Sequence, residues 1–106
     1  MKINWVVKKW KALIVNEIYF ILRLRSEVFV VEQDCVYQDI DKKDLEAIHV
    51  MGYFENKLIA YSRIFNKKEY FKETSFGRAI VKEKYRGTGL GHELVAKSLV
   101  EIKKNY

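Results

Sequence analysis

The stretch GRAIVKEKYRGTGLG, residues 77–91, decides how this chain is interpreted, because an apolar strand there runs into a glycine-rich turn and then into a helix. The N–H groups that begin a helix have no partner inside that helix, and the helix dipole places roughly half a positive charge beside them. The stretch therefore predicts an anion-binding site where the helix begins.

Four residues of this turn favour the anion site. Gly87, Gly89 and Gly91 have no side chain, so they permit positive φ angles and a close approach to the backbone. Arg86 adds a fixed positive charge at the same place. The alternative is an ordinary helix start that happens to contain turn glycines.

Two common phosphate-binding motifs are excluded by the spacing. A Walker A loop requires Gly-Lys-Ser/Thr, and the chain has no such tripeptide. The dinucleotide fingerprint G-x-G-x-x-G fails at His92 when it is counted from Gly87, and at Leu94 when it is counted from Gly89.

Elsewhere in the chain, periodicity predicts four strands and two helices. The predicted strands are residues 3–10, 48–54, 58–65 and 74–81, with a hairpin-like turn at residues 55–57. The predicted helices are residues 17–30, with Asn16 as the N-cap, and residues 89–104, with an apolar stripe of Leu90, Leu94, Val95, Leu99 and Ile102. Residues 32–46 form a polar, acidic loop with one helical turn. This order predicts an α/β (α+β) fold, a mostly antiparallel sheet flanked by helices.

Composition gives broader limits. The length of 106 residues predicts a single domain, residues 1–106, and a hydrophobic content of 49% excludes a disordered chain. The net charge of +6 attracts anions in general, so nucleic acid, anionic lipid and phosphate-rich cofactors all stay open. The lysines are scattered in short doublets, which usually only solvate a surface.

Cysteine and hydropathy indicate the compartment. Cys35 is the only cysteine, so no internal disulfide can form and a reducing environment fits. No signal peptide and no apolar stretch of membrane-spanning length is present. The sequence therefore predicts a cytoplasmic protein without a membrane partner. One cysteine and two distant histidines have no metal-ligand spacing, so no metal is expected.

The turn matches the pattern Arg/Gln-x-x-Gly-x-Gly/Ala through Arg86, Gly89 and Gly91. In this strand-loop-helix setting the pattern resembles the pyrophosphate loop of the GNAT superfamily of N-acetyltransferases. The stretch LRLRSEVFVVEQDC, residues 22–35, is similar to the N-terminal signature of ElaA-like members. The resemblance covers roughly residues 17–102.

The resemblance implies an acetyl-CoA-dependent N-acetyltransferase, which transfers an acetyl group to a primary amine of a small molecule or peptide by direct attack. It places the backbone of Ile80 and Val81 against the pantetheine and acetyl portion of acetyl-CoA. It assigns the pyrophosphate to the residues of the turn, namely Arg86, Gly87, Thr88, Gly89, Leu90 and Gly91. No nucleic acid is expected as a partner.

Proton removal from the amine needs a base, and the sequence offers several. Glu32 follows the first predicted helix, and His49 begins a strand; these two are the leading candidates. Asp39, Asp41 and Glu73 stay open as alternatives. For Glu32 a solvated carboxylate, and for His49 a backbone-bonded structural role, are the competing interpretations.

One departure from the family concerns its C-terminal part. GNAT domains continue past this helix with a fifth strand, whereas this chain stops at Tyr106. We therefore expect a domain truncated after the pyrophosphate-loop helix, with an exposed fourth strand through which a homo-oligomer can form. The alternative functions are a non-catalytic acyl-CoA-binding remnant and, with less support, a basic nucleic-acid-binding module.

Overall fold

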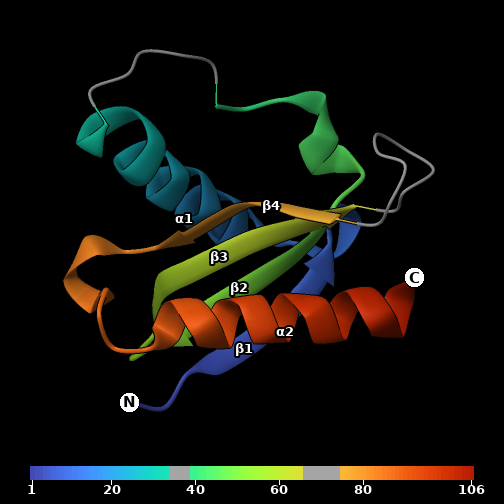
Figure 1. The fold of residues 1–106 in the computed structure, drawn as a ribbon. Helices are drawn as coiled ribbons and strands as arrows, with labels where there is room; N and C mark the ends of the chain where they lie inside the picture. Colours follow the sequence, from blue (N-terminus) through green and yellow to red (C-terminus); the bar gives the residue numbers. More distant parts are fainter. Residues whose placement is uncertain (34–38, 66–74) are drawn as a thin grey trace.

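The computed structural model describes residues 1–33, 39–65 and 75–106, and it places four strands in one sheet. The strands follow in the order β1-β2-β3-β4, and each pairs antiparallel with its neighbour. Their bounds are Asn4–Lys9, Ile48–Phe54, Lys57–Phe65 and Ser75–Val81. Helix α1, Val15–Ser26, covers one face and helix α2, Leu90–Asn105, the other (Figure 1). The predicted fold class is confirmed.

Four short helical segments connect these elements. The π-helical turn η2, Glu27–Glu32, continues α1 directly, and the 3-10 turn η4, Glu83–Tyr85, follows β4. The other two 3-10 turns are η1, Trp10–Ala12, and η3, Lys42–Leu45. The single helical turn predicted inside the acidic loop is therefore present as η3, while residues 34–38 of that loop lie outside the described part of the chain.

Each face of the sheet has its own hydrophobic core. On the α1 face, Ile21 and Leu24 pack against Met51, Tyr61 and Ile80 of the sheet. The second core lies on the α2 face and consists of Ile48, Val50, Ile59, Ala60, Ile64, Leu90 and Leu94. Alternate residues of the central strands thus point to opposite helices, so the sheet lies as a middle layer between α1 and α2. A short loop joins the end of β4 to the start of α2.

The buried row of α2 differs from the predicted stripe. Leu90 and Leu94 are buried as expected, but Leu99 is 53% exposed, whereas Glu101 is 6% exposed. Ser98 continues the buried row, and its hydroxyl lies 2.7 Å from that of Ser62 in β3. This polar contact helps to set which side of α2 faces the sheet. A pattern of apolar residues alone does not reveal such a contact.

The start of α1 also differs from the prediction. The helix begins at Val15, so Asn16 lies inside its first turn and is not the N-cap. Glu17 takes over the capping role, because its carboxylate accepts the Ile14 N–H at 3.0 Å and pairs with Lys8 at 3.0 Å. A carboxylate in the first turn is favourable at the positive helix end.

Two local backbone features shape the sheet. The β2–β3 hairpin turns through Glu55 and Asn56, with φ of 50° and 66°, so left-handed residues form the turn although glycine is absent. In β4 the register with β3 shifts between Tyr61 and Arg63, and Arg78 has a φ of 49°. For an arginine this backbone is strained, so surrounding contacts must hold it in place.

No helix in the described ranges is both long enough and apolar enough to span a bilayer.

Gly52 in β2 gives a test of the sheet packing. A Cβ at this position would lie 2.7 Å from the ring of Trp5, so Gly52→Ala should lower the free energy of unfolding by about 1–3 kcal/mol. Gly77→Ala is the matched control, since a Cβ there meets no atom within 4 Å. Urea unfolding of both variants checks this, and equal stabilities would contradict the packing.

Candidate functional site

The turn between β4 and α2 is open to solvent. Gly87 and Gly89 have φ of 82° and 86°, which is the left-handed region that favours glycine. No atom lies within 4 Å of the place where a Cβ would stand at Gly87, Gly89 or Gly91. The Thr88 hydroxyl donates back to the Tyr85 carbonyl at 2.7 Å and so braces the turn. Among the described residues, no side chain fills the space in front of these glycines.

The amides of the turn and of the first helical turn are also available. The first backbone bond of α2 runs from the Glu93 N–H to the Gly89 carbonyl at 3.2 Å. Within the described ranges, no acceptor is present for the N–H groups of residues 87–92. Free amides at a helix start, with glycines beside them, form a geometry that favours the binding of an anion such as phosphate.

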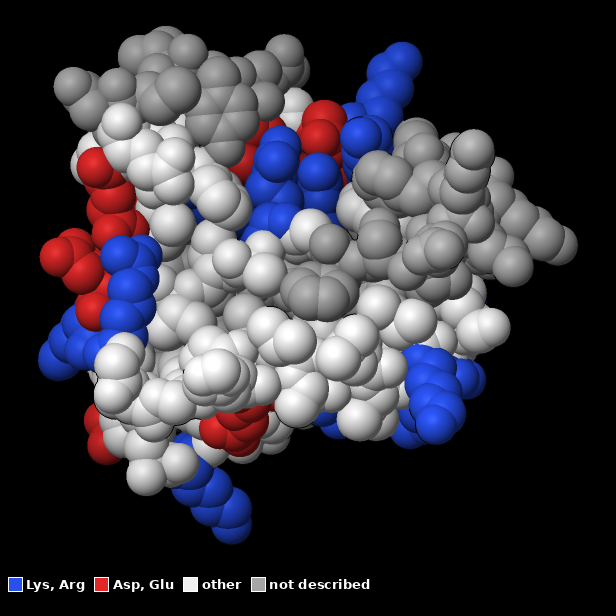
Figure 2. All heavy atoms as spheres, viewed as in Figure 1, with Lys and Arg blue, Asp and Glu red and all other residues white. Residues whose placement is uncertain are grey.

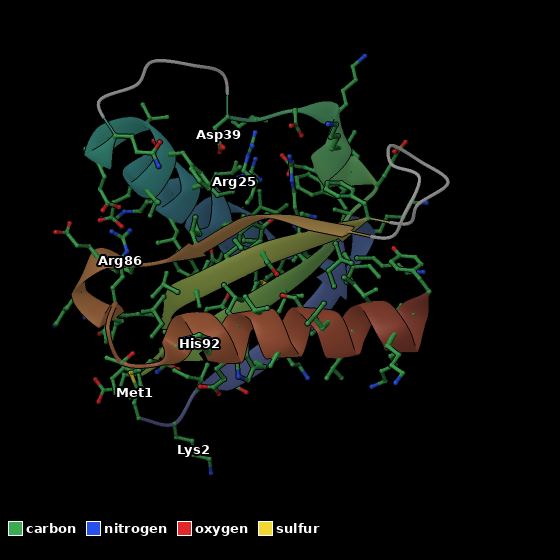
Figure 3. All side chains as sticks on the ribbon, in the orientation of Figure 1. Met1, Lys2, Arg25, Asp39, Arg86 and His92 are labelled. Atoms are coloured by element: carbon green, nitrogen blue, oxygen red, sulfur yellow. The ribbon has the colours of Figure 1, made fainter. Side chains whose placement is uncertain are left out.

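The Arg86 guanidinium is paired within the described structure. Its Nη1 and Nη2 donate to the two carboxylate oxygens of Glu32 at 2.9 and 3.0 Å, and its Nε donates to the Val81 carbonyl at 2.9 Å. The guanidinium lies beside the loop, as Figure 3 shows. Its charge is therefore balanced within the protein.

The Arg86–Glu32 pair is accessible. The Arg86 side chain is 44% exposed and that of Glu32 is 21% exposed. Exposed ion pairs of this kind typically contribute only about 0.2–1 kcal/mol. A hollow of about 440 Å³ borders the pair and is lined by Glu27, Glu32, Lys82, Glu83 and Lys84.

Ile80 and Val81 differ in the direction of their backbone groups and side chains. Ile80 pairs with Tyr61 of β3, and its side chain is buried in the α1-side core. The Lys82 N–H donates to the Ile59 carbonyl at 2.8 Å, so alternation along an antiparallel strand turns the main chain of Val81 to the outer edge of β4. Of its two groups, the carbonyl accepts from Arg86 and the N–H has no partner among the described residues.

His49 lies in a closed environment, which argues against the catalytic interpretation. Its ring is 0% exposed, with Nδ1 2.6 Å from the Tyr61 hydroxyl and Nε2 2.9 Å from the Asp44 carbonyl. Burial lowers the pKa of His49 and outweighs the backbone contact of Asp44, which acts in the opposite direction. The Trp10 ring packs against the imidazole, and the two ring centroids are 5.8 Å apart. These contacts favour the structural role over that of a base.

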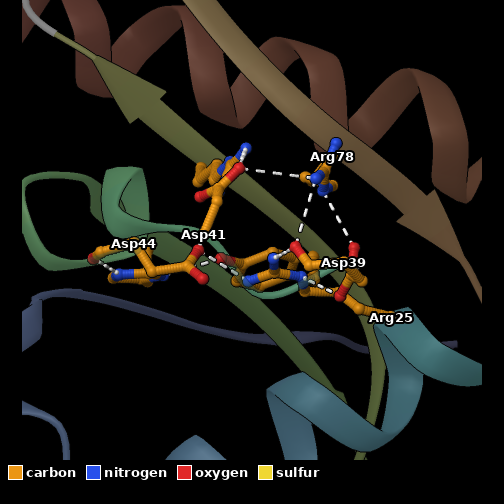
Figure 4. Close-up of polar contacts among 8 residues, drawn as sticks. Arg25, Asp39, Asp41, Asp44 and Arg78 are labelled. Atoms are coloured by element: carbon orange, nitrogen blue, oxygen red, sulfur yellow. Dashed lines mark hydrogen bonds and ion pairs between the residues drawn. The ribbon is translucent and has the colours of Figure 1, made fainter. Parts of the chain in front are cut away.

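Two of the remaining acidic candidates, Asp39 and Asp41, belong to a buried network with three arginines (Figure 4). Arg25, which is 0% exposed, bonds Asp39 Oδ2 at 2.9 Å and Asp44 Oδ1 at 2.6 Å. Arg78 contacts Asp39 Oδ1 at 2.9 Å through Nε. Both oxygens of the Asp39 carboxylate are thereby paired with arginines. Asp39 therefore links the chain before η3 to α1 and β4.

Asp41 is held in the same way from β3. Arg63 bonds Asp41 at 2.7 Å and Asp44 at 2.8 Å through Nη1. Burial alone would raise the pKa of Asp41, but the hydrogen bond and charge of Arg63, together with Arg78, lower the pKa below its ordinary value. A carboxylate stabilised in this way is a poor proton acceptor. Glu73 and Cys35 lie outside the described residues.

Part of this network is visible in the sequence. Arg63 interrupts the apolar run of β3, and a charge in a buried strand signals a partner. Arg78 carries no such signal, because its role depends on the bulge in β4. Within residues 1–33, 39–65 and 75–106, no cluster of three potential metal ligands is present.

The chain as a whole, and not the turn alone, is matched by known proteins. A sequence model of the acetyltransferase (GNAT) family covers residues 15–105. The chain belongs to this family. The GNAT family uses an acyl-CoA donor and an acceptor substrate.

Individual GNAT proteins are similar to this chain in sequence and in structure. Protein ElaA of Escherichia coli is 40% identical over 99 residues, which are 92% of this chain and 65% of the relative. The crystal structure of E. coli ElaA superposes with a TM-score of 0.93 at 37% identity, covering 99% of this chain and 72% of that one. An acyl-CoA N-acyltransferase from Pseudomonas aeruginosa gives a TM-score of 0.94 at 34% identity, covering 99% and 73%.

The GNAT chain thus spans 65% of the length of the curated ElaA relatives that it matches.

The closed environment of His49 predicts a pH-dependent stability. Because folding lowers the pKa of His49, the unfolded chain binds its proton more readily, and the stabilisation is present above about pH 6.5 and is lost as pH falls below it. The free energy of unfolding should therefore fall between pH 7 and pH 5, by at most about 1.4 kcal/mol per pH unit from this group. Urea titrations at three pH values measure the slope.

Two glutamine variants isolate the source of that slope. His49→Gln should flatten the decline, whereas His92→Gln, which changes an exposed histidine of α2, should keep it. A decline that stays equally steep in His49→Gln would show that other groups cause it.

Proposed function

We propose that this chain binds acetyl-CoA and transfers the acetyl group to a primary amine of a small molecule or peptide. The observation that carries the proposal is the row of unpartnered amides at residues 87–92, within the range matched by the family. The P. aeruginosa relative, an acyl-CoA N-acyltransferase at 34% identity, supports an acyl-CoA donor. Since the chain spans 65% of its curated relatives, their complete activity enters here as part of the proposal.

In this proposal the turn holds the donor by its pyrophosphate. The backbone of Gly87, Thr88 and Gly89, with Leu90 and Gly91 of α2, supplies N–H donors and the positive end of the helix dipole. Gly87 and Gly89 keep the approach open because no side chain of the described residues covers it. The Val81 N–H, on the outer edge of β4, is suited to the neighbouring pantetheine arm, while Ile80 fixes the strand from the core.

The transfer itself is an acyl exchange. The neutral amine attacks the thioester carbonyl, a C–N bond forms, the C–S bond breaks, and the proton lost by nitrogen ends on the departing thiol. Negative charge develops on the carbonyl oxygen, so a backbone donor beside it accelerates the reaction. Among the base candidates we retain Glu32, because a ligand at the loop can release it from Arg86.

Two other functions predict different behaviour. An acyl-CoA-binding remnant would bind coenzyme A but release no thiol from acetyl-CoA in the presence of amines. A nucleic-acid-binding module would need a basic stripe, and on the face that Figure 2 shows, the blue and red side chains of the described residues are interspersed around its margins. The described residues on this face therefore form no continuous basic stripe.

Gly91→Glu tests the anion site without straining the backbone. Gly91 is exposed in the first turn of α2, its φ is not positive, and its Cβ would meet nothing within 4 Å, so the variant should fold. The added carboxylate would occupy the position of the phosphate and repel it. We expect coenzyme A affinity to fall by about tenfold or more in calorimetric titration.

Gly91→Gln is the matched control, because glutamine has the size of glutamate without its charge. It should bind coenzyme A more tightly than Gly91→Glu. Equal affinities of the wild type and Gly91→Glu would exclude the start of α2 as the anion site. Thiol release with a panel of amines then separates the enzyme from the binding remnant.

We also propose that the chain can self-associate through β4, which lies at the edge of the described sheet. An unpaired edge strand is a template for pairing with another copy. Sedimentation velocity should show a dimer fraction that increases with protein concentration. This fraction should be smaller in Ala79→Lys, since Ala79 is exposed on this strand. A monomer at all concentrations would contradict this assembly.

A further inference from the structure

Glu32 pairs with the guanidinium of Arg86, a residue that the family resemblance assigns to the pyrophosphate. The pair is bidentate, with Nη1–Oε1 at 2.9 Å and Nη2–Oε2 at 3.0 Å. The third donor, Nε, is anchored on the Val81 carbonyl at 2.9 Å. A carboxylate and a phosphate use the same forked face of a guanidinium, so one excludes the other from it.

The contact is selective among the carboxylates around the loop. Glu27 lies 3.8 Å from Lys82, and no ion pair of the Glu83 side chain is present in the described part of the chain. Among the described acids, only the side chain of Glu32 forms an ion pair with the Arg86 guanidinium. Glu32 is also the last residue of η2, which continues α1, so the pair joins the α1 layer to the loop that begins α2.

We propose that Glu32 is an internal competitor for the donor's diphosphate. In the free protein the carboxylate occupies Arg86; when a diphosphate binds at the amides of residues 87–92, it takes the guanidinium and Glu32 is released. The exposure of the pair makes this exchange possible, since a ligand can reach Arg86 while Glu32 still contacts it. Occupation of the loop is thereby coupled to the end of η2. The inference rests on the anion site of the proposed function.

Inorganic pyrophosphate is the probe, because the competition concerns the anion alone. Glu32→Gln removes the competing charge, and it should bind pyrophosphate about twofold to fivefold more tightly than the wild type, the range expected from the strength of an exposed ion pair. Glu83→Gln is the matched control: it removes one negative charge from η4, beside the same hollow, and the Glu83 side chain forms no ion pair with Arg86 among the described residues. Its affinity should stay close to that of the wild type.

A second background separates competition from a change in overall charge. In an Arg86→Gln chain, adding Glu32→Gln should change the pyrophosphate affinity no more than adding Glu83→Gln does. Thermal melts should show that all variants fold, because the residues changed lie on the surface.

Three results would overturn the inference. These are equal affinities of Glu32→Gln and Glu83→Gln, weaker binding by Glu32→Gln, and no binding of pyrophosphate by either variant. Weaker binding would mean that Glu32 presents Arg86 to the ligand instead of blocking it. If pyrophosphate binds as expected and coenzyme A does not bind, the exchange stands and the proposed function fails.

Discussion

A set of hydrogen-bond donors that the protein leaves unused is the feature on which the site depends. The chain passes from β4 to α2 through a turn with two left-handed glycines, and the N–H groups of residues 87–92 have no acceptor in the described structure. Solvent can satisfy them, so leaving them open costs the fold little, and an anion gains both these donors and the helix dipole. The layers on either side of the sheet hold the turn in place, because Ile80 is buried in one core and Leu90 in the other.

A second constraint stabilises the surroundings of β4. Arg25, Arg63 and Arg78 reach Asp39, Asp41 and Asp44 from three different elements, and most of the charges are buried. Buried charges are costly unless they are paired. The chain that carries the three aspartates therefore has few alternative arrangements. The same contacts hold Arg78, whose positive φ marks the bulge of β4. The network therefore serves the site by fixing the strand that leads into the turn.

Much of the fold follows from local patterns in the sequence. Apolar alternation predicted β2 as the structure has it, and the glycine turn predicted where α2 begins within one residue. The errors arose where a side chain acts across elements: Ser98 meets Ser62, which buries a row of α2 that hydropathy does not indicate, and Glu17 replaces Asn16 in capping α1. Spacing along the chain carries no information about such contacts.

The candidate site shows the same division. The open glycines could be predicted from the backbone demands of the turn, whereas the pairing of Arg86 with Glu32 joins residues far apart in sequence and needs the folded chain. For His49 the sequence left two interpretations open, a base and a structural group, and its buried position beside Tyr61 favours the structural one. Residue type alone does not distinguish a base from a structural group.

Amide chemical shifts measured by NMR during titration with coenzyme A test the anion site most directly. We predict saturable shifts that are largest for the N–H groups of residues 87–92, where the described structure leaves them without a partner. Unchanged shifts there, or a response confined to another surface, would contradict the assignment of the anion site to the start of α2.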